Sequence, residues 1–182
     1  MLIRHADPVA DAAACAAIYA VYVSDGLASL ETAVLSTEEF RGRMERISPR
    51  YPYLVAEEGG AVIGYAYGTL HRERSAYRWA CESSVYIDIA HHRRGIGRRL
   101  YEALFGLLRK QRLQIVCAGI TLPNAASVAL HESFGFEPVG VYRRIGWKFG
   151  AWHDVGWWQL DLIPPGNETP PEPGPPARLD AR

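Results

Sequence analysis

The chain has 182 residues, 48% of them hydrophobic, which is enough for one soluble domain with a sizeable core. Twenty basic residues balance twenty acidic ones, so no overall field favours nucleic acid, a membrane surface or a highly acidic partner. The cysteines, Cys15, Cys81 and Cys117, have neither the number of a disulfide framework nor the spacing of a zinc site. With no signal-peptide pattern and no run of about 18 apolar residues, we expect a cytoplasmic protein that does not span a membrane.

Strand and helix signals interleave in the first half of the chain. Residues 2–6 are expected to form a short strand, and Asp7-Pro8 to open the helix that follows. A second helix is expected after Ser36, because acidic residues favour the positive end of a helix. Two apolar runs that meet at Gly59-Gly60 predict a β-hairpin, and residues 79–89 predict the next strand.

The second half predicts two strand-to-helix units and a closing hairpin. Apolar residues recur every three or four positions from Ile96, which indicates an amphipathic helix. Residues 114–122 predict a strand, and Asn124 can cap a helix over 125–133. The segments EPVGVYRRIGW and DVGWWQLDL predict two strands that pair as a long hairpin. The whole order favours a mixed sheet covered by helices.

The last 19 residues have a different composition. Seven of the twelve prolines lie after residue 163, and such a segment cannot sustain a helix or a sheet ladder. We therefore expect one domain over residues 1–163 and a disordered, proline-rich tail over 164–182.

The segment HHRRGIGRRL, residues 91–100, joins a predicted strand to a predicted helix. Backbone N–H groups at such a junction, together with Gly95 and Gly97, suit a phosphate or pyrophosphate. Arginines can meet further anionic oxygens. A merely charged surface face is the alternative that this pattern leaves open.

Other readings of the basic segment are disfavoured. The P-loop pattern is missing, and Leu100 occupies the third glycine position of a dinucleotide fingerprint. Residues 90–112 hold seven Arg or Lys against one Glu, but stacking aromatics do not alternate with these charges, so nucleic acid is not expected. His91 and His92 are adjacent and lack a further ligand at metal spacing, so no metal is expected either.

Two side chains stand out as candidates for acid-base chemistry. Glu82 lies on an otherwise apolar strand, where burial would make it a plausible general base. A salt bridge to Arg72, Arg74 or Arg78 is the alternative. His131 follows Asn124 on a predicted helix, where a structural histidine is the ordinary interpretation.

Taken in order, these segments resemble the GCN5-related N-acetyltransferases (GNAT), whose acetyl-CoA loop is written Q/R-x-x-G-x-G/A. The corresponding residues here are His92-Arg93-Arg94-Gly95-Ile96-Gly97, so the first position departs from the pattern. The segments AYRWACESSVYI, GITLPNAASVALHESFGF and GAWHDVGWWQLDL are similar to the phosphinothricin N-acetyltransferase branch, and the resemblance covers residues 2–162.

The resemblance implies a mixed α/β (α+β) GNAT fold with a splayed, mostly antiparallel sheet of about seven strands flanked by helices. It places acetyl-CoA between the fourth and fifth strands, with no metal. The implied contacts are strand pairing of the pantetheine arm, a pyrophosphate loop and a polar group at the fifth strand. The residues involved are Val85, Tyr86, Ile87, Arg93, Arg94, Gly95, Ile96, Gly97, Arg98, Asn124, Ser127 and Ser133.

The same resemblance implies that Glu82 deprotonates an acceptor amine, directly or through water. His131 would either protonate the CoA thiolate or help bind and deprotonate the amine. The implied acceptor is phosphinothricin or a related small amino acid such as methionine sulfone or sulfoximine. Its pocket would be formed by Leu30, Arg74, Tyr77, Tyr86 and Val155.

Leu30 stands where the branch often has an aromatic residue, so a different acceptor amine is the second hypothesis. That acceptor would be a polyamine, an aminoglycoside or a peptide N-terminus. The third hypothesis is a binding module without catalysis. The resemblance also implies a homodimer.

Overall fold

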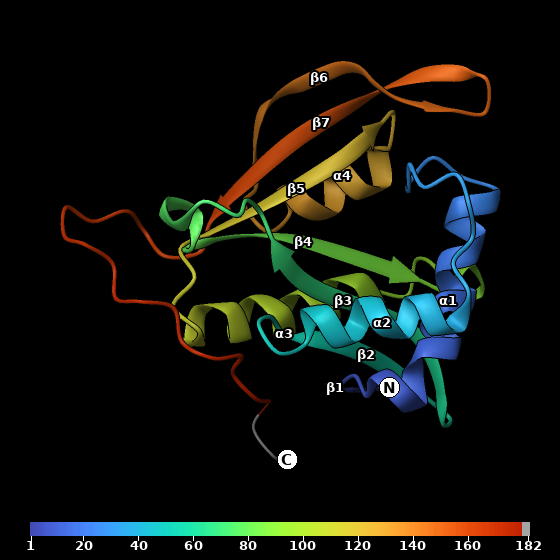
Figure 1. The fold of residues 1–182 in the computed structure, drawn as a ribbon, viewed down its shortest axis with the longest axis horizontal. Coiled ribbons are helices and arrows are strands. Elements are labelled where there is room, and N and C mark those ends of the chain that lie inside the picture. Colours follow the sequence, from blue (N-terminus) through green and yellow to red (C-terminus); the bar gives the residue numbers. More distant parts are fainter. Residues whose placement is uncertain (180–182) are drawn as a thin grey trace.

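The computed structural model describes residues 1–179, which form one seven-stranded sheet with helices on both faces (Figure 1). The strand order is β1-β2-β3-β4-β5-β7-β6. The strands are β1 (Leu2–His5), β2 (Tyr53–Glu58), β3 (Ala61–Leu70), β4 (Ala80–Ile87), β5 (Ile115–Leu122), β6 (Glu137–Lys148) and β7 (Ala151–Asp161). All neighbours are antiparallel except β4 and β5, which are parallel. The predicted mixed, mostly antiparallel sheet of seven strands is confirmed.

Four α-helices cover the sheet, and the predicted start signals explain where three of them begin. They are α1 (Pro8–Ser24), α2 (Thr37–Ile47), α3 (Ile96–Lys110) and α4 (Ala125–Glu132). The side chains of Asp7, Ser36 and Asn124 accept hydrogen bonds from the first turns of α1, α2 and α4. No side chain among residues 1–179 caps α3, which begins after Gly95 at a φ of 75°.

Alternating residues of the central strands build two cores, one on each face of the sheet. Leu54 and Ala66 point to the core that α3 fills with Leu100, Leu104 and their neighbours. The residues between them in β2 and β3 point instead to a core of tyrosines and aliphatic residues under α1 and α2. Consecutive residues of β4 therefore serve opposite faces of the sheet.

The parallel pair β4–β5 is hydrogen-bonded over a short distance only. Ala80 pairs with Ile115, Cys81 with Val116 and Glu82 with Cys117, and the pairing stops there. Beyond this point β4 stays paired with β3, while β5 stays paired with β7 as far as Leu122. The two strands consequently separate into a V, which is visible in Figure 1 as the gap that opens between β4 and β5.

The proline-rich segment runs along the domain without forming a helix or strand in its described part, 164–179. The indole N–H of Trp79 donates to the carbonyl of Pro171 at 2.9 Å, and the Gly174 N–H donates to the carbonyl of Gln111. The last three residues of the predicted tail lie outside the described residues. The domain boundary near residue 163 stays a prediction.

A partly buried ion pair holds α1 against the first two strands. Arg4 forms a two-pronged contact with Asp11, at 2.7 and 2.8 Å, and its Nε lies 2.8 Å from Glu57. Burial by itself would raise the pKa of the Asp11 carboxyl, but hydrogen bonds from Arg4 and from the Asp7 backbone outweigh it, so the pKa lies below its ordinary value. Because the pKa of Asp11 is lower in the folded protein, its contribution to stability is present at neutral pH. That contribution is lost as the pH falls through the pKa of the folded state.

We expect Asp11→Asn to lower the free energy of unfolding by about 2 kcal/mol at pH 7, because Arg4 then lacks its charged partner. Urea unfolding at pH 7 and at pH 3 measures the effect, and the difference between variant and wild type should shrink at the lower pH. Asp25→Asn, at an exposed position after α1, is the matched control. An Asp11→Asn protein that unfolds at the wild-type urea concentration at pH 7 would contradict this.

Candidate functional site

A cavity of about 490 Å³ occupies the V between β4 and β5. One wall is the segment from Ser83 to Ile87, and the other is formed by Gly119, Ile120 and Thr121. Because β4 and β5 no longer pair there, the segment Val85–Ile87 has no partner strand on that edge, where the Tyr22 hydroxyl already contacts the backbone of Ile87. An extended ligand can therefore pair with β4 in place of a strand.

The glycine loop, residues 92–97, lies at the mouth of this cavity. Arg93, Gly95, Ile96, Gly97 and Arg98 line it, while the N–H groups of the first turn of α3 lack a side-chain cap. An uncapped helix start with a positive φ glycine and two arginines favours an anion. The sequence-predicted phosphate loop thus lies at the mouth of the cavity.

Arg94 and Ser133 have other surroundings. Arg94 turns to Glu58 on β2, with Nη2 2.9 Å from the carboxylate, and does not line the cavity. Ser133 lies just outside it, where its hydroxyl accepts from Arg98 at 2.9 Å and donates to the carbonyl of Leu130. Ser133 therefore touches the loop through Arg98.

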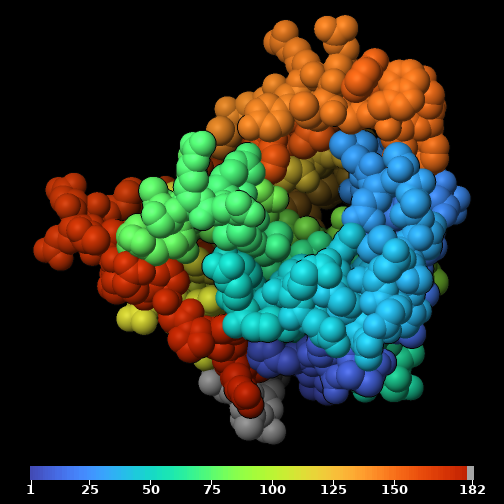
Figure 2. Space-filling view, viewed as in Figure 1, coloured from blue at the N-terminus to red at the C-terminus, as the bar shows by residue number. Residues whose placement is uncertain are grey.

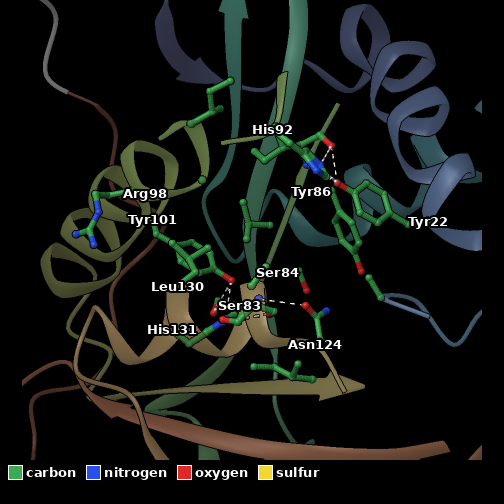
Figure 3. Close-up of a pocket in the computed structure, with 18 of the residues that line it drawn as sticks. Tyr22, Ser83, Ser84, Tyr86, His92, Arg98, Tyr101, Asn124, Leu130 and His131 are labelled. Atoms are coloured by element: carbon green, nitrogen blue, oxygen red, sulfur yellow. Dashed lines mark hydrogen bonds between the residues drawn. The ribbon is translucent and has the colours of Figure 1, made fainter. Parts of the chain in front are cut away.

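Asn124 and Ser127 line the cavity from the start of α4. The Asn124 side chain accepts from the Ser127 N–H at 3.1 Å, so its carbonyl oxygen is used as a cap and its NH₂ group remains for a ligand. Figure 3 shows this contact close to Ser83 and Ser84 of the opposite wall.

His131 is a buried part of the cavity wall, with both ring nitrogens in hydrogen bonds. Nδ1 lies 2.7 Å from the carbonyl oxygen of Ser127, which can only accept, so Nδ1 carries the proton. Nε2 lies 3.1 Å from the hydroxyl of Tyr101 and therefore accepts from it. Burial lowers the pKa of His131, and the bond to Ser127 only partly opposes this, so the ring is neutral at pH 7.

Tyr101 and Ser83 extend this contact to the cavity floor. The Ser83 hydroxyl donates to the Tyr101 oxygen at 3.5 Å, and Figure 3 shows Ser83, Tyr101 and His131 converging. All three residues line the cavity. The sequence indicated Tyr101 only as a helix-packing residue, because its spacing in α3 matches that of the buried leucines.

Tyr22 and His92 form a second polar group that the sequence did not predict as part of the site. The Tyr22 hydroxyl donates to the carbonyl of Ile87 at 2.5 Å, and it lies 2.8 Å from Nε2 of His92. This contact ties α1 to the end of β4 just before the glycine loop (Figure 3). It uses the Ile87 carbonyl, while Tyr86 packs edge-on against Tyr19 and Tyr22.

Glu82 lies at the point where the V begins and belongs to the opposite face of β4 from Ser83. Its Oε1 is 2.9 Å from Nδ1 of His71 and 3.7 Å from Nη1 of Arg72. Of the three arginines expected as partners, Arg72 approaches and Arg78 instead pairs with Glu172. No local sequence signal indicated His71.

The residues expected to contact an acceptor come from separate segments of the chain. Arg74 and Tyr77 are exposed at the turn Ser75–Tyr77, and Val155 lies on β7 opposite Thr121. Leu30 packs against β6, where a Cβ added at Gly146 would be 2.5 Å from its Cδ1. Figure 2 shows a hollow in this face, bordered by the segment around residue 75, the segment near residue 30 and the β6–β7 hairpin.

Among residues 1–179 no cluster of three or more His, Cys, Asp or Glu side chains is arranged to hold a metal ion. None of the helices in this part of the chain has the length and apolar character needed to cross a bilayer.

Comparison with known proteins points to one family. A family model described as "Acetyltransferase (GNAT) domain" matches residues 4–157. The chain is 41% identical to phosphinothricin N-acetyltransferase of Streptomyces viridochromogenes over 164 residues, which is 90% of each chain. It is 38% identical over 160 residues to an L-methionine sulfoximine/L-methionine sulfone acetyltransferase of Salmonella typhimurium, covering 84% of this chain and 92% of the relative.

A solved structure from Sinorhizobium meliloti gives the same result for the fold. It is described as a GNAT superfamily phosphinothricin acetyltransferase in complex with AcCoA. The TM-score is 0.89 at 35% identity, over 94% of this chain and 93% of that one.

We expect Tyr101→Phe to lower the free energy of unfolding by about 1–2 kcal/mol, because His131 then loses its donor and Ser83 its acceptor inside the protein. Chemical denaturation measures this, with Tyr142→Phe at a half-exposed position as the matched control. In the wild type, ¹H–¹⁵N spectra of the imidazole should show the proton on Nδ1. A proton on Nε2, or equal stability of the two variants, would contradict the assignment.

Proposed function

We propose that this chain, which belongs to the GNAT acetyltransferase family, transfers the acetyl group of acetyl-CoA to the amino group of phosphinothricin or of a closely similar amino acid such as methionine sulfone or sulfoximine. That it is an N-acetyltransferase similar to the phosphinothricin acetyltransferases follows from the family match and the relatives. The observation that carries the proposal is the V between β4 and β5, with an unpaired strand edge on one side and an uncapped helix start at its mouth.

The residues present fit acetyl-CoA, which supplies an acetyl group activated as a thioester. Gly95, Gly97 and the first N–H groups of α3 would hold the pyrophosphate, assisted by Arg93 and Arg98. The pantetheine arm would then run back along Val85–Ile87, toward the start of the V. On this path the thioester would lie near Ser83 and Glu82, where the strands begin to separate.

Acetyl transfer needs an amine without its extra proton and an acid for the leaving thiolate. Glu82 lies on the opposite face of β4 from Ser83, beside His71, so we assign it to the amine. Ser83 points to the other face, where Tyr101 and His131 follow it. We therefore assign the chain of Ser83, Tyr101 and His131 to the thiolate side. Because Nε2 of His131 accepts from Tyr101, the ring has to take up a proton there before the two hydroxyls, with their hydrogen bonds reversed, can pass one to the sulfur.

The acceptor side chain would bind over the hollow. Arg74 offers a bidentate partner for a carboxylate or for the tetrahedral tail of the acceptor, and Tyr77 offers a hydroxyl. Leu30, Tyr86 and Val155 would supply apolar walls. All three cysteines are free thiols, which suits the cytoplasm as the compartment.

We also propose a homodimer, because the β6–β7 hairpin has a large apolar surface. Seven apolar side chains on it are 48–66% exposed, and large apolar side chains gathered on one exposed element favour an interface. They are Val139, Val141, Tyr142, Ile145, Trp147, Phe149 and Trp152.

For the reaction, we expect CoA release with phosphinothricin, methionine sulfone or methionine sulfoximine, and much less with spermidine, kanamycin or an N-terminal peptide. A thiol-detecting assay measures it. Glu82→Gln should lower kcat/KM by about 100-fold or more, the usual contribution of a general base. Glu45→Gln, on the exposed side of α2, is the control. Preferred turnover of a polyamine or peptide would overturn the acceptor class, and full activity of Glu82→Gln would overturn its role.

For the assembly, light scattering after size-exclusion chromatography should give twice the chain mass. A Trp147→Ser, Trp152→Ser double variant should shift toward the monomer, while Val9→Ser, at an exposed position of α1, should not. A monomeric wild type at micromolar concentration would rule the dimer out.

A further inference from the structure

His71 lies directly against the Glu82 carboxylate. It follows the last residue of β3, and the pairing of Thr69 with Glu82 brings the start of this loop alongside β4. Its Nδ1 is 2.9 Å from Oε1 of Glu82. Since an ionised carboxylate only accepts hydrogen bonds, Nδ1 carries the proton and Nε2 of the neutral ring has a free lone pair.

The two side chains are partly accessible and lie at the start of the V. The side chain of His71 is 16% exposed and that of Glu82 is 26% exposed. Glu82 pairs with Cys117 in the last β4–β5 step before the strands separate. The pair therefore lies where the proposed acetyl transfer would take place.

Aromatic side chains hold the imidazole ring from two sides. Tyr77 meets it edge to face at 5.8 Å between ring centroids, and Trp157 does so at 6.2 Å. The charged and titratable groups around it are Glu82 on β4, Arg72 and Tyr77 on its own loop, and the Cys117 thiol on β5 beside Glu82. The ring is therefore fixed by one carboxylate and two aromatic rings.

We propose that His71 and Glu82 act as a pair in which Nε2 of His71 takes the proton from the acceptor amine while Glu82 holds the ring in place. This rests on the proposed function and changes the role of Glu82 from proton acceptor to orienting partner. The arrangement is the one by which a carboxylate fixes the tautomer of a catalytic histidine.

The proton balance of this step is complete. The acceptor ammonium gives one proton to Nε2, and the free amine attacks the thioester carbonyl, forming the C–N bond. The C–S bond then breaks and the sulfur leaves with the electron pair. The nitrogen loses a second proton as the amide forms, and the thiolate gains one proton to become the thiol, so these two transfers balance. The proton on His71 passes to solvent.

Three variants of His71 separate the role of a proton acceptor from that of a purely structural side chain. His71→Asn keeps an N–H where Nδ1 lies but has no basic nitrogen, His71→Gln places its amide near Nε2, and His71→Ala leaves room for added imidazole. His5→Ala, on β1 at the far end of the sheet order, is the matched control. Thermal unfolding and acetyl-CoA binding of each variant establish that it is folded.

We expect kcat/KM to fall about 100-fold or more in all three His71 variants, with KM for acetyl-CoA unchanged. The acidic limb of the plot of log kcat/KM against pH should disappear in His71→Asn and His71→Gln, and imidazole should restore activity to His71→Ala about tenfold or more. His71→Asn with wild-type activity and pH profile overturns the proposal, and so does a folded His71→Ala that imidazole does not rescue. Failure of the proposed function is distinct, because the wild type itself would then release no CoA.

Discussion

The site depends on one constraint: β4 and β5 pair through only three residues and then diverge. Each strand remains fixed on its outer edge, β4 by β3 and β5 by β7, so the gap cannot close by sliding either strand inward. The inner edge of β4 is left without a partner strand and borders a cavity of about 490 Å³. The glycine loop, α3 and α4 take their positions around that opening, and the anion site and the polar wall follow from it.

Because side chains alternate along β4, the same strand separates the two halves of the chemistry. Ser83 points to the side where Tyr101 and the neutral His131 lie, and Glu82 points to the side of His71. The acceptor amine and the leaving sulfur can then lie on opposite sides of the acetyl carbon. The ion pair between Arg4 and Asp11 supports the site indirectly. It fixes α1 against the sheet, and α1 places Tyr22 at the end of β4.

Local sequence signals predicted much of this arrangement because their causes are local. Asn124 caps α4 through its own first turn, and Gly95 stands where φ is positive, so both positions were found from residue type and spacing. Tyr101 was interpreted as packing, since a buried hydroxyl at helical spacing looks the same as a core aromatic. His71 meets Glu82 only through the register of β3 on β4. Arg94 reaches Glu58 across 36 positions of sequence, which no local pattern can indicate.

A crystal structure of the protein with CoA and methionine sulfone would show on which side of β4 each of them binds. We expect CoA in the V, its pantetheine paired with Val85–Ile87 and its pyrophosphate on the first turn of α3. The acceptor amine should lie on the opposite side of β4 from Ser83, within hydrogen-bonding distance of the His71–Glu82 pair. An acceptor bound on the Tyr101 side of β4, or CoA bound outside the V, would contradict it.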